Sequence, residues 1–199
     1  MTQYSYSRVS TFEQCPLKFK FHYIDNVEVE EYPNEDDPLL LGRCMDNGLE
    51  HGFQAALDIY NETIPYNSQK KEWELAKLEY WINRLGKHFK DGQFQIEIKN
   101  DWFLGYADWY KDGHLIDFKY ASPKNAENYR NSAQLHLYYE LMTQFGYDIQ
   151  TMTYVVIPKT YIRVKKGESE KMFYNRLMET LDSLDPILID VEYDSKYVE

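Results

Sequence analysis

The 199-residue chain is poor in the features that mark disulfide-rich, metal-cluster and membrane-embedded proteins. It has two cysteines, Cys15 and Cys44, which excludes a disulfide framework or a four-cysteine cluster within one chain. It contains no run of 18 apolar residues, so we expect no membrane-spanning segment. The opening residues MTQYSYSR lack the apolar core of a signal peptide, and we expect the protein to work in the cytoplasm.

Positive charge is also scarce. The 22 lysines and arginines are outnumbered by 33 aspartates and glutamates, which leaves a formal net charge of −11. A protein that binds nucleic acid through its general surface is usually basic, so this excess of acid argues against such a role. Net charge does not decide what a local site binds, however, and a site for a divalent cation concentrates carboxylates. Acidic residues cluster in two stretches, 28–37 and 179–199.

Apolar periodicity and turn residues predict one mixed α/β domain over residues 1–199. Helices are expected over 8–14, 16–24, 39–60, 69–90, 124–146 and 168–184, and strands over 93–99, 102–110, 114–120 and 151–158. The order of these elements implies a central mixed sheet flanked by helices. Residues 1–38 would form an N-terminal helical segment, 39–158 the core, and 159–199 a C-terminal helix with an acidic tail.

A predicted hairpin carries the most informative polar residues of the chain. Asp-Gly at 112–113 separates two β-like runs, which is the strongest short signal for a two-residue turn. That turn places Asp108 directly opposite Asp117, with their Cβ atoms about 5 Å apart. Lys119 is two residues beyond Asp117 and therefore points to the same face of the sheet.

Two opposed carboxylates should repel each other and destabilise the hairpin unless a cation lies between them. A hard divalent cation with oxygen ligands would meet that need. A neighbouring lysine could stabilise a phosphate, and metal-bound water is the natural nucleophile for phosphodiester cleavage. The alternative is a solvated surface hairpin, which the apolar neighbours Leu115, Ile116 and Phe118 make less favourable.

Two further pairs of residues have helical spacing and could join this site. Asp46 and Glu50 share one face of a predicted helix, where like charges would benefit from a shared cation or serve as a base. Gln134 and Tyr138 share a face of the helix after the hairpin, where they could hold a phosphate or orient Lys119. The alternatives are a solvated helix face for the first pair and ordinary helix packing for the second.

The stretch Lys18–Tyr23 mixes basic and aromatic side chains, a composition that suits single-stranded nucleic acid because aromatic rings stack on bases. The alternative is an amphipathic helix that packs Phe19 and Tyr23 inward. The residue pattern alone leaves both interpretations open.

Taken in chain order, these residues resemble the RecB-like branch of the PD-(D/E)XK nuclease superfamily, which includes CRISPR-associated and phage exonucleases. The matching segments are Ser5–Ser7 with Phe12, Cys15, Pro16, Phe19 and Tyr23; Gly42 with Asp46, Leu49 and Glu50; Gly105 with Asp108; Asp117–Lys119; and Gln134 with Tyr138. Each motif is weak by itself, but together they follow the family's order over residues 4–158.

The resemblance implies a restriction-endonuclease-like core over residues 39–158. The residues it assigns to the metal are Asp46, Asp108, Asp117 and the Phe118 carbonyl; the catalytic residues are Asp108, Asp117, Lys119 and Glu50; and the substrate-binding residues are Gln134 and Tyr138. The expected cofactor is Mg²⁺ or Mn²⁺.

The chain departs from the family pattern at two places. Family members often have histidine where this chain has Asp46, and an aspartate there favours a hard ion but adds negative charge. Some members bind an iron–sulfur cluster through four cysteines, of which Cys15 alone has a counterpart here. We therefore expect no iron–sulfur cluster.

The resulting expectation is a Mg²⁺- or Mn²⁺-dependent deoxyribonuclease, namely an exonuclease of phage or bacterial recombination and repair. Expected partners are DNA and a recombination or single-strand-binding protein, with no membrane and with self-association left open. One alternative is a catalytically impaired nuclease fold that acts as a DNA- or protein-binding module. Others are an endonuclease subunit that needs a partner and a structural protein with a chance hairpin.

Overall fold

The computed structural model describes residues 3–27 and 34–198, so residues 28–33 of the first acidic stretch lie outside it. Its helices are α1 (Tyr6–Gln14), α2 (Pro16–Phe19), the π-helical turn η1 (Lys20–Ile24), α3 (Pro38–His51), α4 (Phe53–Thr63), α5 (Gln69–Phe89), the 3-10 helix η2 (Pro123–Asn131), α6 (Gln134–Gln144), α7 (Glu170–Asp182) and the 3-10 turn η3 (Ser195–Tyr197). Its strands are β1 (Gln93–Lys99), β2 (Leu104–Lys111), β3 (His114–Ala121), β4 (Thr151–Pro158) and β5 (Ile187–Val191).

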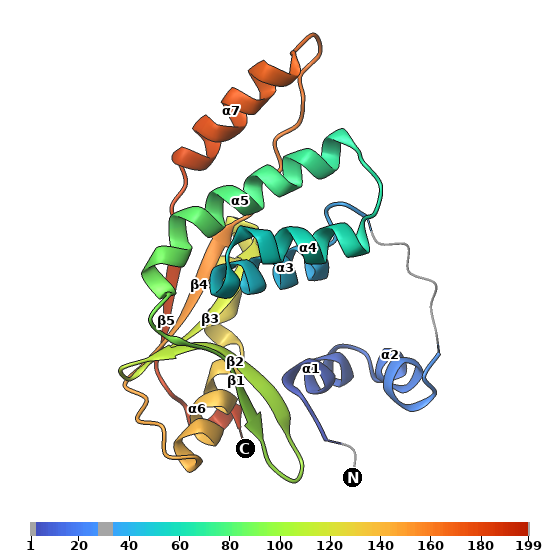
Figure 1. Cartoon of the computed structure of the whole chain (residues 1–199). Coiled ribbons are helices and arrows are strands. Elements are labelled where there is room, and N and C mark those ends of the chain that lie inside the picture. Colours follow the sequence, from blue (N-terminus) through green and yellow to red (C-terminus); the bar gives the residue numbers. More distant parts are fainter. Residues whose placement is uncertain (1–2, 28–33, 199) are drawn as a thin grey trace.

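The strands of the described chain form one mixed sheet in the order β1-β2-β3-β4-β5. β3 and β4 run parallel, and the other neighbouring pairs are antiparallel. Figure 1 shows α3, α4 and α5 gathered beside the upper part of the sheet, with α7 projecting beyond α5. A crossover through η2 and α6 joins β3 to β4, as parallel strands require. The expected mixed sheet flanked by helices is therefore confirmed.

Side chains from the two faces of the sheet enter separate hydrophobic cores. One core joins α3, α4, α5 and α7 to the sheet through residues such as Phe118 and Val155. The other core joins α6 to the opposite face through residues such as Tyr154. Because successive strand residues point to opposite faces, Asp117 and Lys119 lie on the side of α6, away from Phe118.

The turn between β2 and β3 has the predicted register. Lys111 pairs with His114, and Trp109 pairs with Ile116 two positions further on. The turn residues at 112–113 both have positive φ, +48° and +87°, as a two-residue hairpin turn of this type requires. The local chemistry of the Asp-Gly pair therefore sets how the two strands face each other.

The ladder between β2 and β3 ends one position before Asp108, so Asp108 and Asp117, which the predicted register places opposite each other, do not form a strand pair. Asp108 instead turns its carboxylate toward β3, where Oδ2 accepts a hydrogen bond from the Phe118 N–H at 2.8 Å. On its other side β1 is also irregular, because Gln95 lies across from Asp108 with a φ of +46°. Such a backbone conformation costs about 1–3 kcal/mol outside glycine, so the sheet is distorted where the polar residues gather.

Two predicted helices are each divided in the structure. The helix expected over 39–60 breaks at Gly52, whose φ of +91° favours glycine and separates α3 from α4. The helix expected over 124–146 consists of the 3-10 helix η2 followed by α6. Gly146 has a φ of +88° directly after the end of α6, as predicted for a glycine that terminates a helix.

The two ends of the chain also differ from expectation. α1 begins at Tyr6, two residues earlier than expected, and Ser5 caps it by accepting a hydrogen bond from the Arg8 N–H. The expected acidic tail contains β5, which pairs with β4 and extends the sheet to Val191. The sheet therefore draws on residues well beyond the predicted core limit of 158.

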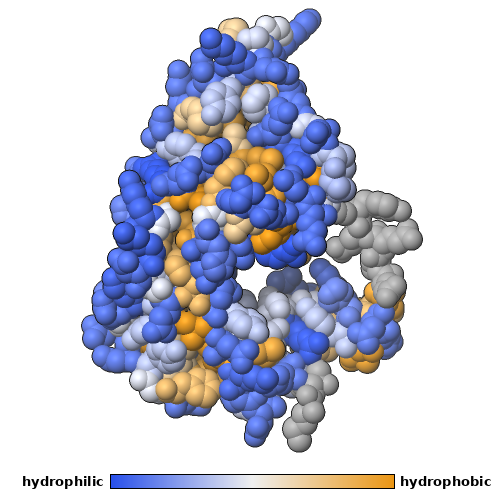
Figure 2. All heavy atoms as spheres, in the orientation of Figure 1, coloured by the Kyte–Doolittle hydropathy of each residue, from blue (hydrophilic) through white to orange (hydrophobic). Residues whose placement is uncertain are grey.

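The N-terminal segment α1–η1 is attached to the sheet at its start and is otherwise exposed or half-exposed. Tyr4 forms a parallel bridge with Phe103, which precedes β2. Apolar side chains remain at the surface, among them Leu17 and Phe21, which are 58% and 46% exposed. Figure 2 shows this apolar surface over α2, and it shows an open gap between the segment and the layer that contains α3 and α4.

Within residues 3–27 and 34–198, none of the helices combines the length and the apolar character that a membrane crossing demands.

Gly48 tests the packing of α3 against α5. A Cβ at Gly48 would lie 2.2 Å from Cδ1 of Ile82, whereas a Cβ at Gly42 on the same helix meets nothing within 4 Å. Both alanine variants gain similar helix propensity. We expect Gly48→Ala to unfold with a free energy about 1–3 kcal/mol below that of Gly42→Ala, because overpacking displaces Ile82. Urea denaturation followed by circular dichroism measures the difference, and equal stability would contradict the close packing.

Candidate active site

Asp117 and Lys119 form an ion pair on β3. Nζ of Lys119 lies 2.5 Å from Oδ2 of Asp117, whose side chain is only 1% exposed, whereas the Lys119 side chain is 25% exposed. The other carboxylate oxygen of Asp117, Oδ1, is buried and has no hydrogen-bond partner among the described residues. A buried polar atom without a partner costs free energy. The ion pair therefore leaves Asp117 only partly satisfied.

Asp108 and Asp46 approach this pair from two other elements. Asp108 comes from β2, and its hydrogen bond to the Phe118 N–H holds its carboxylate beside β3. Asp46 comes from α3, which packs against β3, and its charge interacts with those of Asp117 and Lys119. Because β2 and β3 no longer pair at this point, side chains from the helical layer and from the sheet can meet. The structure thus brings together four residues predicted from the sequence.

Burial is the largest cause of an unusual pKa at each of the three aspartates. It raises the pKa of Asp46 to about 7, with a further increase from the charge of Asp117. The pKa of Asp108 lies well above its usual range for the same reasons, because burial and the charges of Asp117 and Asp46 all favour the protonated form. The pKa of Asp117 is also raised by burial, although Lys119 opposes the shift.

Lys119 is strongly held in its charged form. Burial alone would lower the pKa of its ammonium group, but the carboxylates of Asp117 and Asp108 outweigh that effect and raise it above the ordinary value. If all four groups were ionised, the three aspartates and Lys119 would carry a net charge of minus two. One divalent cation would neutralise that charge, which is the effect expected of a bound ion on neighbouring carboxylates.

The side chains present fit a hard divalent cation in chemistry, although they are not arranged around one. In the described part of the chain, no group of three or more acidic, histidine or cysteine side chains forms a ready-made metal site. Two of the carboxylate oxygens have other partners, since Lys119 holds Oδ2 of Asp117 and the Phe118 N–H donates to Oδ2 of Asp108. The unpartnered Oδ1 of Asp117 and the all-oxygen donor set are nevertheless what Mg²⁺ or Mn²⁺ prefers.

Gln134 and Tyr138 lie together at the start of α6. Nε2 of Gln134 donates a hydrogen bond to the Tyr138 hydroxyl at 3.3 Å. Burial raises the pKa of Tyr138 to about 12, Gln134 lowers it, and the charges of Asp117 and Asp108 raise it further. Tyr138 therefore lies close enough to the aspartates to feel their charge, and Gln134 is joined to the site through it.

Glu50 and Phe118 have different surroundings from the three aspartates. Glu50 lies one helical turn beyond Asp46, and its carboxylate contacts Nε2 of His51 at 3.5 Å. None of its contacts with described residues reaches Asp108 or Asp117. The Phe118 side chain packs into the opposite core, so only its backbone faces the site.

Tyr154 belongs to the site but was not singled out from the sequence. It pairs with Asp117 across the parallel strands β3 and β4, and the Lys119 ammonium lies 5.9 Å from the centre of its ring. Its hydroxyl accepts a hydrogen bond from the Leu135 N–H at the start of α6. A parallel register depends on the crossover between the strands, so no local pattern in the sequence could have identified this residue.

The basic and aromatic stretch Lys18–Tyr23 shows features of both interpretations. Phe19 is half-buried and its ring lies 5.2 Å from that of Tyr23, as inward packing predicts. Phe21 and Lys18 are exposed and remain available to a ligand. The segment is also joined to the site, since the Tyr6 hydroxyl is hydrogen-bonded to Oγ of Ser132 at 2.9 Å, close to the start of α6.

A mixed sheet that presents two aspartates and a lysine on adjacent strands, covered by helices on both faces, is the architecture of restriction-endonuclease-like nucleases. A family model of the PD-(D/E)XK nuclease superfamily matches residues 3–194. The chain belongs to this superfamily, whose members are typically nucleases that use divalent metals such as Mg²⁺ or Mn²⁺. Comparisons with curated proteins and with solved structures give no significant match.

Asp46 gives the metal-free protein a specific pH dependence. Its folded pKa of about 7 lies above the ordinary value of 3.8, so its contribution to stability is present in acid and is lost as the pH rises toward 7. We expect Asp46→Asn, which cannot ionise, to be more stable than the wild type by about 2 kcal/mol at pH 8. The difference in the free energy of unfolding should disappear below pH 3.8, because Asp46 is then protonated in both the folded and the unfolded chain.

Chemical denaturation in EDTA across this pH range measures the effect. Asp58→Asn, on the exposed side of α4, is the control for replacing an aspartate with its amide. A stability difference between Asp46→Asn and the wild type that stays constant with pH would contradict the raised pKa.

Proposed function

We propose that the chain is a Mg²⁺- or Mn²⁺-dependent DNA exonuclease that hydrolyses phosphodiester bonds in recombination, repair or phage DNA processing. The observation that carries the proposal is the group of three aspartates around Lys119, between β2, β3 and α3, in which Asp117 is buried and the other two aspartates are half-buried. The resemblance to RecB-like exonucleases supports the exonuclease activity, and a bacterial or phage-infected cytoplasm is the setting that such a substrate suggests.

In this proposal Asp108 and Asp117 bind the cation, with Asp46 and the Phe118 carbonyl as further ligands. The N–H of Phe118 points to Asp108, and in an extended strand the carbonyl of the same residue points the same way, which supports its assignment. The bound cation would lower the pKa of water and polarise the scissile phosphate. Lys119 would stabilise the negative charge that develops on the phosphate.

The remaining predicted residues have supporting roles. Tyr138, held by Gln134, would line the path of the DNA strand beside the aspartates. Glu50, one helical turn beyond Asp46 on α3, is proposed as an accessory base. The exposed basic and aromatic side chains of Lys18–Tyr23 would contact single-stranded DNA close to the cleavage site.

A second candidate function is a nuclease fold that binds DNA or protein without cleaving it. The observation in its favour is the extra negative charge of Asp46 in a chain that already carries a net charge of −11. Additional negative charge would attract a cation and would also repel a phosphate. An endonuclease subunit that needs a partner remains the third candidate, and the choice of DNA substrate separates it from an exonuclease.

Lys119 tests the proposed activity directly. We expect the wild type to degrade linear DNA in the presence of Mn²⁺ and to leave covalently closed circular DNA intact, because an exonuclease needs a strand end. Lys119→Ala should lower kcat by at least about 100-fold, since it removes the group that stabilises charge in the transition state. Timed digestion of end-labelled linear DNA measures the rate.

Lys111→Ala, at the turn end of the same hairpin, is the matched control and should retain wild-type activity. Unchanged cleavage by Lys119→Ala would contradict the assignment. Cleavage of the covalently closed circular DNA would show that the chain is an endonuclease and not an exonuclease. A wild type that binds DNA but cleaves neither form would favour the binding module.

A further inference from the structure

A separate hollow lies against α5, on the side of the sheet that faces away from Asp117 and Lys119. Its volume is about 430 Å³, which falls within the range of small-ligand sites. The hollow is bounded by α5 and by residues 160–164, which follow β4. Figure 1 shows the chain after β4 passing α5 on its way to α7. The two walls therefore come from segments far apart in the sequence.

Two of the three cations that line the hollow are already paired with carboxylates. Nζ of Lys70 lies 2.6 Å from Oδ1 of Asp36, and Nζ of Lys77 lies 2.6 Å from Oε1 of Glu74. The third cation is Arg163, whose exposed guanidinium group forms no ion pair with any described residue. An unpaired guanidinium group of this kind favours an anionic part of a ligand.

Buried ammonium groups in and beside the hollow have N–H donors without an acceptor among the described residues. Lys77 and Lys159 are only 4% and 5% exposed. Among the described residues, Lys77 donates one hydrogen bond, to Oε1 of Glu74 at 2.6 Å, and Lys159 donates one, to the Asp36 carbonyl at 2.9 Å. An ammonium group has three N–H donors, so each retains N–H groups that the surrounding protein does not use.

The wall also contains polar atoms without partners. Oε2 of Glu74 and Nε1 of Trp73 are buried and form no hydrogen bond with any described residue. The Glu74 carboxylate thus places an unused acceptor, Oε2, beside the unused N–H donors of Lys77. A nucleobase edge also has donors and acceptors side by side, so it could pair with both groups. Trp73 and Tyr161 add aromatic surface of the kind on which bases stack.

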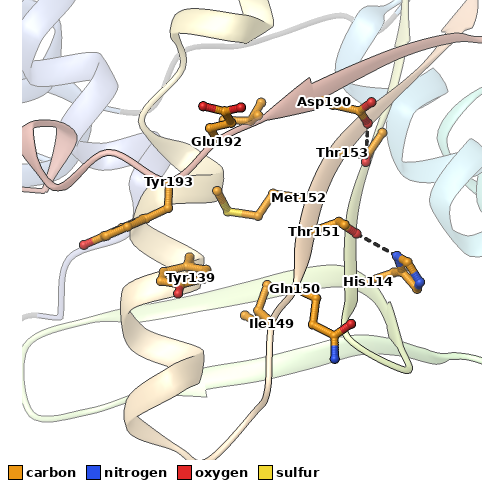
Figure 3. Close-up of a pocket in the computed structure, with 11 residues that line it drawn as sticks. His114, Tyr139, Ile149, Gln150, Thr151, Met152, Thr153, Asp190, Glu192 and Tyr193 are labelled. Carbon is orange, nitrogen blue, oxygen red and sulfur yellow. Dashed lines mark hydrogen bonds between the residues drawn. The ribbon is translucent and has the colours of Figure 1, made fainter.

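A hollow at the other end of the sheet lacks these features. It has a volume of about 570 Å³ and includes His114, the first residue of β3. Four of its polar side chains are paired with each other, as Figure 3 shows: His114 is bonded to Thr151 at 2.6 Å, and Thr153 donates to Asp190 at 2.8 Å. The hollow at α5 differs because its wall holds buried polar atoms without a partner among the described residues, Oε2 of Glu74 and Nε1 of Trp73, so it is the better candidate for a binding site.

We propose that the hollow at α5 binds a nucleotide, either free or as part of a DNA strand. The base edge would face Glu74 and Lys77, its ring would lie against the aromatic side chains of the wall, and the phosphate would contact Lys70 and Arg163 at the rim. Binding there requires neither a divalent cation nor cleavage, because none of the three aspartates lines the hollow.

Isothermal titration calorimetry of the full chain in EDTA tests this site, with the four deoxynucleoside 5′-monophosphates and inorganic phosphate as separate probes. We expect at least one nucleotide to bind at least tenfold more tightly than phosphate. Arg163→Ala, an exposed position, and Glu74→Gln should each weaken binding at least fivefold. Lys87→Ala, on the exposed side of the same helix, is the control and should bind as the wild type does.

Asp117→Asn separates this site from the proposed active site, and it should bind nucleotides with wild-type affinity. Loss of binding in Asp117→Asn would place the nucleotide at the aspartates and would overturn the inference, as would the absence of nucleotide binding or equal affinity for phosphate. If Glu74→Gln does not fold, Arg163→Ala still decides the outcome. A 5′-phosphorylated single strand that displaces the nucleotide would identify a DNA strand as the source of the ligand, and failure to displace it would identify free nucleotides.

Discussion

The site depends on the ion pair between Lys119 and Asp117, in which one ammonium group faces three carboxylates. The ammonium contacts a single oxygen of Asp117, so it neutralises only part of the charge that β2, β3 and α3 bring together. Burial makes the remaining charge costly and raises the pKa of the aspartates. A site of this kind is stabilised by protons in the absence of metal and by a divalent cation in its presence.

The rest of the fold keeps these charged groups close together. The ladder between β2 and β3 ends before Asp108, and Gln95 adopts an unfavourable backbone conformation across from it. This irregular part of the sheet lets Asp46 approach from α3 while Tyr154 and Tyr138 enclose the site from the other side. The two hydrophobic cores supply the stability that such a strained and charged arrangement requires.

Features determined by local chemistry could be predicted from the sequence. The turn at 112–113 fixed the hairpin register because both of its residues tolerate positive φ, and the register then pointed to Asp108, Asp117 and Lys119. Helical spacing added Asp46 and the pair formed by Gln134 and Tyr138, which the structure brings to the same region. Their catalytic roles are still proposals.

Features determined by long-range packing could not be predicted in this way. The break at Gly52 was missed because apolar spacing continues from α3 into α4. β5 was missed because it lies within an acidic stretch and becomes a strand by pairing with β4. The position of Tyr154 beside Asp117 depends on the parallel register of β3 and β4, which the intervening crossover sets. The unused polar atoms at Trp73 and Glu74 likewise emerge only from the assembled fold.

The central claim is that Asp46, Asp108 and Asp117 form a binding site for a divalent cation. The most direct measurement is anomalous X-ray diffraction from crystals of the wild-type chain soaked in Mn²⁺. The account predicts an anomalous peak bonded to the carboxylates of Asp108 and Asp117, with the Lys119 ammonium moved away from Asp117. Absence of a peak there at saturating Mn²⁺, with Lys119 still paired to Asp117, would contradict it.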